Sequence, residues 1–136
     1  MAADDRRALV DALEKAPFSV LLGLKIESAA NGGAVVRMPF NLRLLNDGGP
    51  KAPVHGGAIA TLADLAACAA VWSLKETTRS ATISMTVNYT GFATESDLVA
   101  SAKVRRKGKR IASLSVEIVD DSRALVADAL ITYKIA

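Results

Sequence analysis

The stretch APVHGGAIATLADLAACAAVW, residues 52–72, is the part of the sequence that most clearly indicates the architecture of this chain. It holds the only histidine, His55, and continues as a run of small apolar residues in which Asp64 is the one carboxylate. Alanine takes seven of the fifteen positions from 58 to 72, and only Thr61 and Asp64 among them are plainly polar. A helix that is apolar on every side must be covered nearly all round. We therefore expect a helix over about residues 56–74, enclosed by a curved sheet or by a second copy of the chain.

Asp64 is out of place on such a helix. It shares one face with Thr61 and Cys68, because these residues are spaced at i, i+3 and i+7. An ionised, unpaired and dry carboxylate would cost several kcal/mol. Two interpretations follow: a structural acid bonded to a backbone N–H or to an arginine across the core, or a catalytic carboxylate beside a cleft.

The His-Gly-Gly start of the helix favours the second interpretation. Glycines at a helix N-terminus leave backbone N–H groups approachable at the positive end of the dipole, which suits a developing oxyanion. The alternative is a plain entry turn with His55 as a cap. Gly56 and Asp64 are eight residues apart, roughly 12 Å along a helix. If they act on one carbonyl group, they come from two antiparallel copies, so the catalytic hypothesis predicts a dimer with shared sites.

The other segments predict an α+β protein with an antiparallel sheet around one central helix. Pattern and turn residues indicate a helix over 4–15 ended by Pro17, an apolar turn at 18–23, a strand pair around 31–33, a loop over 41–55 and four further strands. The strand that follows the central helix alternates, with Ile83, Met85 and Val87 expected on one side.

Composition narrows the class of protein. The 136 residues suit a single domain over 1–136, with an N-terminal helical segment over 1–16. The net charge of +3 comes without a broad basic face or interleaved aromatics, so no nucleic-acid partner is expected. Cys68 is the lone cysteine, and neither a signal peptide nor a membrane span is recognisable, so we expect a cytoplasmic protein. A single histidine without partners argues against a metal site.

These residues resemble a known family. The segment VHGGAIATLADLAACAA is similar to the signature of hotdog-fold acyl-CoA thioesterases of the PaaI-like, phenylacetate-pathway type. The segments LLGLKIESAANGGAVVRMPF, MTVNYTGFA, AKVRRKGKRIA and ALVADALITYKI resemble its strands, so the likeness covers nearly the whole chain from about Pro17. It implies a hotdog fold, a homodimer formed by pairing sheets edge to edge, often a dimer of dimers, and no cofactor beyond the CoA of the substrate.

The resemblance also implies roles for individual residues. Asp64 takes the place of the catalytic acid, the Gly56 amide that of the carbonyl-polarising donor with Gly57 and His55 beside it, and Thr82 that of the hydroxyl that assists the acid. The CoA contacts fall on Tyr89 and on the hairpin residues Arg106, Lys107, Gly108, Lys109, Arg110 and Ile111. One departure is Gly49, where many members carry Asn or Gln; Asn46, three residues earlier, is the candidate replacement.

The leading hypothesis is an acyl-CoA thioesterase in which Asp64 acts as general base or nucleophile. The first alternative is an acyl-CoA-binding module of the same fold without catalysis, which the glycine at position 49 motivates. The second is a hotdog hydratase or dehydratase of enoyl thioesters, which the spacing of His55 and Asp64 suits poorly. The cations around Gly108 are either a solvated turn or a phosphate-binding site.

Overall fold

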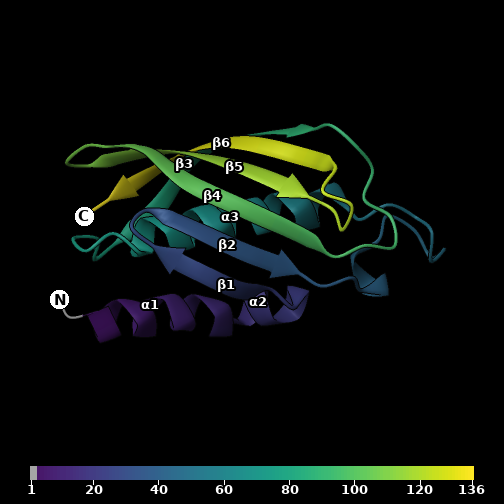
Figure 1. Cartoon of the computed structure of the whole chain (residues 1–136), viewed down its shortest axis with the longest axis horizontal. Coiled ribbons are helices and arrows are strands. Elements are labelled where there is room, and N and C mark those ends of the chain that lie inside the picture. Colours follow the sequence, from purple (N-terminus) through teal and green to yellow (C-terminus); the bar gives the residue numbers. More distant parts are fainter. Residues whose placement is uncertain (1–2) are drawn as a thin grey trace.

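The computed structural model describes residues 3–136, which form a six-stranded antiparallel sheet, three α-helices and one 3-10 helix (Figure 1). The elements are α1 (Ala3–Lys15), α2 (Pro17–Leu22), β1 (Lys25–Ala30), β2 (Gly33–Met38), η1 (Leu42–Leu44), α3 (Gly56–Trp72), β3 (Ser80–Tyr89), β4 (Leu98–Lys107), β5 (Ile111–Val119) and β6 (Leu125–Ile135). The strand order is β1-β2-β4-β5-β6-β3, so β1 and β3 are the free edges. The predicted α+β class is confirmed, and the six strands and the central helix follow one another in the predicted order, with α2 as an additional helix.

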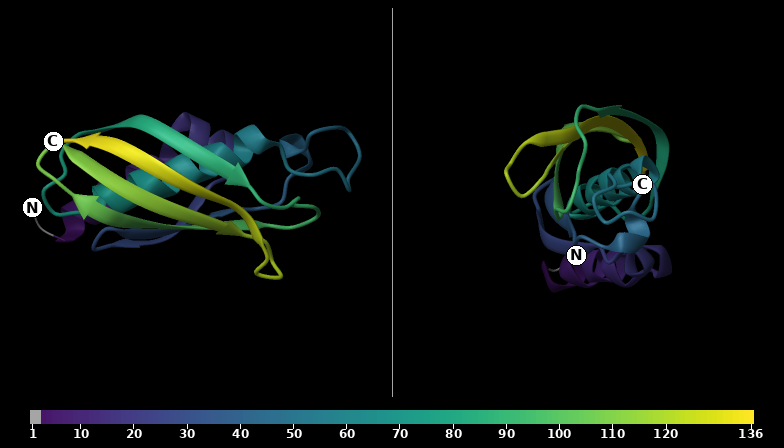
Figure 2. Two further views of the ribbon diagram at one scale, coloured as in Figure 1. Left: turned by 90° about the horizontal axis from the view of Figure 1, so that it is seen from above. Right: turned by 90° about the vertical axis from the view of Figure 1, so that its right-hand side faces the viewer.

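Helix α3 lies in the concave face of the sheet, which curves around it when the molecule is viewed end-on (Figure 2). Nine of its 17 residues are buried, and six of the nine are alanines whose short side chains let the sheet approach closely. The residues left partly exposed form a stripe that contains Thr61, Asp64, Leu65 and Cys68. Within residues 3–136, no helix is long and apolar enough to cross a membrane.

The N-terminal segment differs in one respect from the prediction. Helix α1 matches the expected 4–15, and residues 1 and 2 of the expected 1–16 segment lie outside the described residues. The predicted apolar turn at 18–23 is wrong, because residues 17–22 form helix α2. Pro17 starts that helix, where its missing N–H costs nothing, and Gly23, at a φ of 73°, ends it in the left-handed conformation.

Strand β3 contains a bulge that changes which side chains face the helix. Its pairing with β6 shifts between positions 82 and 84, and Thr82 is then opposite Tyr133. Ile83 is the extra residue, and its side chain is 54% exposed. The prediction that Ile83 shares a side with Met85 and Val87 is therefore wrong, since only the latter two pack against the core. A bulge redirects neighbouring side chains, and here it lets Thr82 reach α3.

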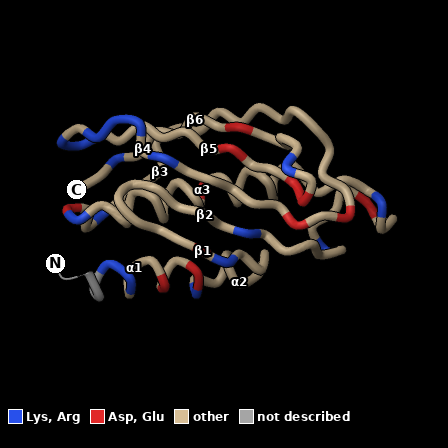
Figure 3. Tube along the Cα trace, viewed as in Figure 1, with Lys and Arg blue, Asp and Glu red and all other residues tan. Residues whose placement is uncertain are grey.

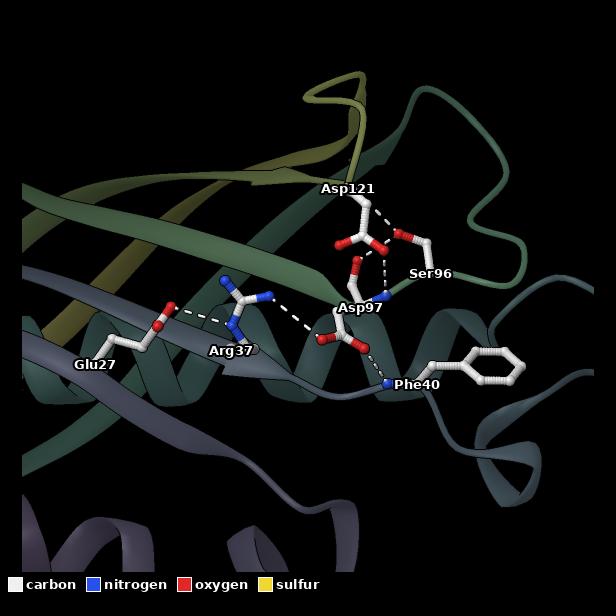
Figure 4. A network of polar contacts seen from close by, with 6 residues as sticks. All are labelled: Glu27, Arg37, Phe40, Ser96, Asp97 and Asp121. Atoms are coloured by element: carbon white, nitrogen blue, oxygen red, sulfur yellow. Dashed lines mark hydrogen bonds and ion pairs between the residues drawn. The ribbon is translucent and has the colours of Figure 1, made fainter.

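A polar network holds the start of the loop that leads to α3 (Figure 4). Asp97, just before β4, accepts a hydrogen bond from Phe40 N at 2.7 Å and lies 3.4 Å from the Arg37 guanidinium. Arg37 in turn lies 3.4 Å from Glu27 on β1. The Ser96 hydroxyl adds a bond to the Asp97 carbonyl at 2.7 Å. The network therefore ties β1, β2 and β4 to the chain segment that begins at Phe40.

Replacing Asp97 by Ala is expected to lower the free energy of unfolding by about 1–3 kcal/mol, because the Phe40 N–H loses its acceptor and the Arg37 guanidinium loses one of its two carboxylate partners. Chemical denaturation followed by circular dichroism measures this change. Asp97→Asn is the matched control, since its amide oxygen still accepts from Phe40 N, and it should be destabilised less. An Asp97→Ala variant as stable as wild type would show that the network does not hold the loop.

Candidate active site

The N-terminus of α3 presents one free backbone donor. His55 is the N-cap, and its Nδ1 accepts a hydrogen bond from Gly57 N at 2.8 Å. The Gly57 amide is therefore engaged, whereas the Gly56 N–H has no acceptor among residues 3–136. This N–H lies at the positive end of the helix dipole, where oxyanions are stabilised. Of the two glycines, the geometry favours Gly56 as a donor to substrate.

Tyr89, at the end of β3, packs against this helix terminus. Its hydroxyl donates a hydrogen bond to Gly56 O at 2.7 Å. A Cβ added at Gly56 would lie 3.3 Å from the Cζ atom of the Tyr89 ring. The absence of a side chain at position 56 thus permits the close approach of the ring.

Asp64 is held by two hydroxyl groups from neighbouring strands. Thr82 Oγ1 donates to Asp64 Oδ1 at 2.8 Å, and Tyr133 OH lies 2.6 Å from the same oxygen and 2.9 Å from the Asp64 backbone O. Asp64 Oδ2 has no hydrogen-bond partner in the described part of the chain. The sequence predicted Thr82 but missed Tyr133, whose apolar strand context indicates only a core residue. Burial raises the pKa of Tyr133, so its hydroxyl stays protonated and donates.

The partly exposed face of Asp64 opens on a cavity of about 240 Å³. Its lining combines the polar atoms around Asp64 with an apolar wall from Phe18, Leu24 and Leu65, and none of the described lining residues is cationic. Cys68 also lines it, as its predicted place on the Asp64 face requires. Burial raises the pKa of the Cys68 thiol, which disfavours the thiolate needed for nucleophilic attack.

The interpretation of Asp64 as an acid paired with an internal arginine does not fit this arrangement. None of the ion pairs formed within residues 3–136 involves Asp64. The buried arginine, Arg6, instead donates to the carbonyl groups of Trp72, the last residue of α3, and of Lys75 and Thr77 in the segment that follows it. In the same described range, no group of three or more His, Cys, Asp or Glu could hold a metal ion.

Gly56 lines a second cavity, of about 320 Å³, that does not include Asp64. Asn46 lines it as well, together with Tyr89 and Phe92, and the backbone N of Asn46 is bonded to Pro53 O at 2.9 Å. Gly49, at the position where the resemblance implies Asn or Gln, is not part of this lining. Asn46 and Gly56 are therefore neighbours, while Asp64 of the same chain faces a different cavity.

The basic hairpin between β4 and β5 lies at the end of the sheet that is farthest from the N-terminus of α3 (Figure 3). Lys107 is paired with Glu76 at 2.7 Å, and this contact holds the pKa of the Glu76 carboxyl below its usual range. Ile111 of β5 pairs with Lys134 of β6, and the next residue of β6, Ile135, pairs with Ser80. The hairpin therefore lies beside the Ser80 end of β3. Because Ser80 and Tyr89 are the two ends of β3, the hairpin and Tyr89 are roughly 30 Å apart in one chain.

The sequence and the fold of this chain are similar to those of known proteins. The family model of the thioesterase superfamily matches residues 53–127, from the segment before α3 to the start of β6. The chain belongs to the thioesterase superfamily. It is 34% identical to the protein named "Putative esterase" from Halobacterium salinarum, over 86% of this chain and 80% of that relative.

Solved structures place this thioesterase-superfamily protein among hotdog folds. The PaaI protein of the Escherichia coli phenylacetic acid degradation operon superposes with a TM-score of 0.84 at 25% identity, covering 100% of this chain and 96% of PaaI. A Pseudomonas aeruginosa protein superposes with a TM-score of 0.83 at 28% identity, covering 92% of this chain and 98% of its own. The predicted membership in the PaaI-like hotdog family is confirmed, and the protein is a thioester hydrolase.

Proposed function

We propose that this thioester hydrolase cleaves acyl-CoA, with Asp64 as general base or nucleophile and the Gly56 amide polarising the thioester carbonyl group. The main support for this proposal is the environment of Asp64. Hydroxyl donors fix one oxygen of its carboxylate, the other oxygen is free among the described residues, and the cavity that it faces contains no cationic side chain. A structural acid would have its acceptors satisfied within the core.

The two catalytic groups are proposed to meet across a dimer. In one chain Gly56 and Asp64 face different cavities and are roughly 12 Å apart along α3. The strand β3 is a free sheet edge whose Ile83 and Tyr89 side chains are about half exposed, and such an edge is a template for pairing. Antiparallel pairing of two β3 strands would set the two α3 helices antiparallel. Asp64 of each copy would then approach the Gly56 end of the other.

The same dimer is proposed to assemble the CoA site. Tyr89 and the hairpin over 106–111 lie at opposite ends of β3 in one chain. Antiparallel pairing would bring Tyr89 of one copy toward the hairpin of its partner. The cations of the hairpin then provide partners for the phosphate groups of the nucleotide. These cations are Arg105, Arg106, Lys107, Lys109 and Arg110.

Both chemical routes use the same atoms. In the general-base route Asp64 Oδ2 takes a proton from water while the water oxygen attacks the carbonyl carbon. The oxyanion that forms accepts a hydrogen bond from the Gly56 N–H of the partner copy. Its collapse breaks the C–S bond, and the CoA thiolate leaves and takes up the proton. In the nucleophilic route Asp64 Oδ2 attacks the carbonyl carbon, the C–S bond breaks and the CoA thiolate leaves, and water then cleaves the resulting anhydride to the free acid and the Asp64 carboxylate. Neither route needs a cofactor beyond the CoA of the substrate. We also propose that the protein is cytoplasmic, because its one cysteine is free and suits a reducing compartment.

The test is a screen of the purified protein against short, medium, long and aryl acyl-CoA esters, with release of free thiol as the readout. We expect turnover of at least one ester class. Binding of CoA esters without thiol release across the panel would instead indicate a binding module. Formation of a 3-hydroxyacyl product from an enoyl-CoA ester would indicate a hydratase.

A further inference from the structure

We propose that Tyr133 is a positioning residue that, together with Thr82, occupies Asp64 Oδ1 and thereby assigns the chemistry to Asp64 Oδ2. This inference rests on the proposed function and extends it to a residue that does not touch the substrate. It also specifies which of the two carboxylate oxygens reacts.

The contacts at Asp64 support the assignment. Two donors converge on Oδ1, from Thr82 at 2.8 Å and from Tyr133 at 2.6 Å. Among the described residues no donor reaches Oδ2. A carboxylate is symmetric, and without such contacts its two oxygens would exchange by rotation about the Cβ–Cγ bond. With both donors in place, this rotation breaks two charge-assisted hydrogen bonds.

The backbone makes the two donors a unit. Thr82 on β3 and Tyr133 on β6 are directly opposite one another in the sheet, immediately beside the bulge at Ile83. Side chains of directly opposed residues are neighbours, so the bulge sets both hydroxyls on the face that meets α3. Without the extra residue, the regular alternation of β3 would turn Thr82 away from Asp64.

Tyr133 is placed to orient a group and not to react. Tyr133 is only 2% exposed, so neither substrate nor water reaches its hydroxyl freely. The ionisable and polar groups around Asp64 are Tyr133 from β6, Ser80 and Thr82 from β3, Thr61 and Cys68 from α3 itself and Ser19 from α2. None of them carries a positive charge, so the orientation of Asp64 depends on hydroxyl donors.

The test compares Tyr133→Phe with Ile131→Val, both in the wild-type chain. The Phe variant keeps the ring and loses only the hydroxyl, and we expect kcat for the best acyl-CoA ester to fall about 10- to 100-fold with KM within about twofold of wild type. Ile131 is buried on the same strand and face two residues away. Its truncation by one methylene lowers stability without touching Asp64, and kcat should stay at the wild-type value.

A second measurement, by infrared spectroscopy, tests the contact between Tyr133 and Asp64 without relying on enzyme activity. The infrared carboxylate stretch of Asp64, identified by its loss in Asp64→Asn, should shift in Tyr133→Phe and remain in place in Ile131→Val. Unchanged kcat and an unchanged carboxylate band in Tyr133→Phe would overturn the inference. It would also be overturned if Ile131→Val lost as much kcat as Tyr133→Phe, because the loss would then follow from reduced stability. If wild type cleaves no ester, the proposed function fails, whereas the infrared result still decides whether Tyr133 holds Asp64.

Discussion

Replacing Asp64 by Asn lowers kcat for acyl-CoA hydrolysis by about 100- to 10,000-fold, the range expected when a general base is removed. The amide is isosteric with the carboxylate and still offers an oxygen to Thr82 and Tyr133, so the chain should fold with a melting temperature close to that of wild type. Thiol release under saturating substrate measures kcat, and thermal denaturation checks the fold. Hydrolysis at the wild-type rate by a folded Asp64→Asn variant would make Asp64 a structural acid.

Replacing Gly56 by Pro is expected to lower kcat by about 100- to 1000-fold, as seen when one oxyanion donor is deleted. Proline removes the free N–H while fitting the first position of a helix. His55 already has φ −60° and ψ 133°, which a residue before proline adopts readily.

Gly56→Ala is the matched control for this variant. It introduces the same Cβ, 3.3 Å from the Tyr89 ring, but keeps the N–H. Steric pressure on Tyr89 therefore affects both variants, and the difference in kcat between them reports the hydrogen bond alone. Equal losses in the two variants would mean that crowding of Tyr89, and not a missing donor, slows the reaction.

The sequence predicts the central helix well because the segment is apolar nearly all round. Residues 58–72 leave no polar face, and a sheet that wraps the helix is the direct physical solution. The spacing of Thr61, Asp64 and Cys68 likewise places them at one cavity. These predictions depend only on local periodicity.

Other parts of the site depend on contacts between distant segments. The bulge at Ile83 cannot be predicted from the alternation of β3, which favours a regular strand and would leave Thr82 on the wrong face. Tyr133 lies 69 residues from Asp64, and nothing in its strand context distinguishes it from a core aromatic residue. The sequence does not predict the helix over 17–22, because Pro17 ends the preceding helical pattern, although proline is equally favourable as a first helical residue.

Each active site is proposed to combine Asp64 of one copy with Gly56 of the other, and this arrangement can be tested by subunit complementation. Asp64→Asn and Gly56→Pro chains are each expected to be nearly inactive as homodimers. When they are co-expressed with different affinity tags, each heterodimer has one site with both defects and one intact site. With random pairing half of the dimers are heterodimers, so the mixture should recover about a quarter of the wild-type kcat per dimer. A mixture no more active than the two parent variants, although heterodimers form, would contradict the shared site.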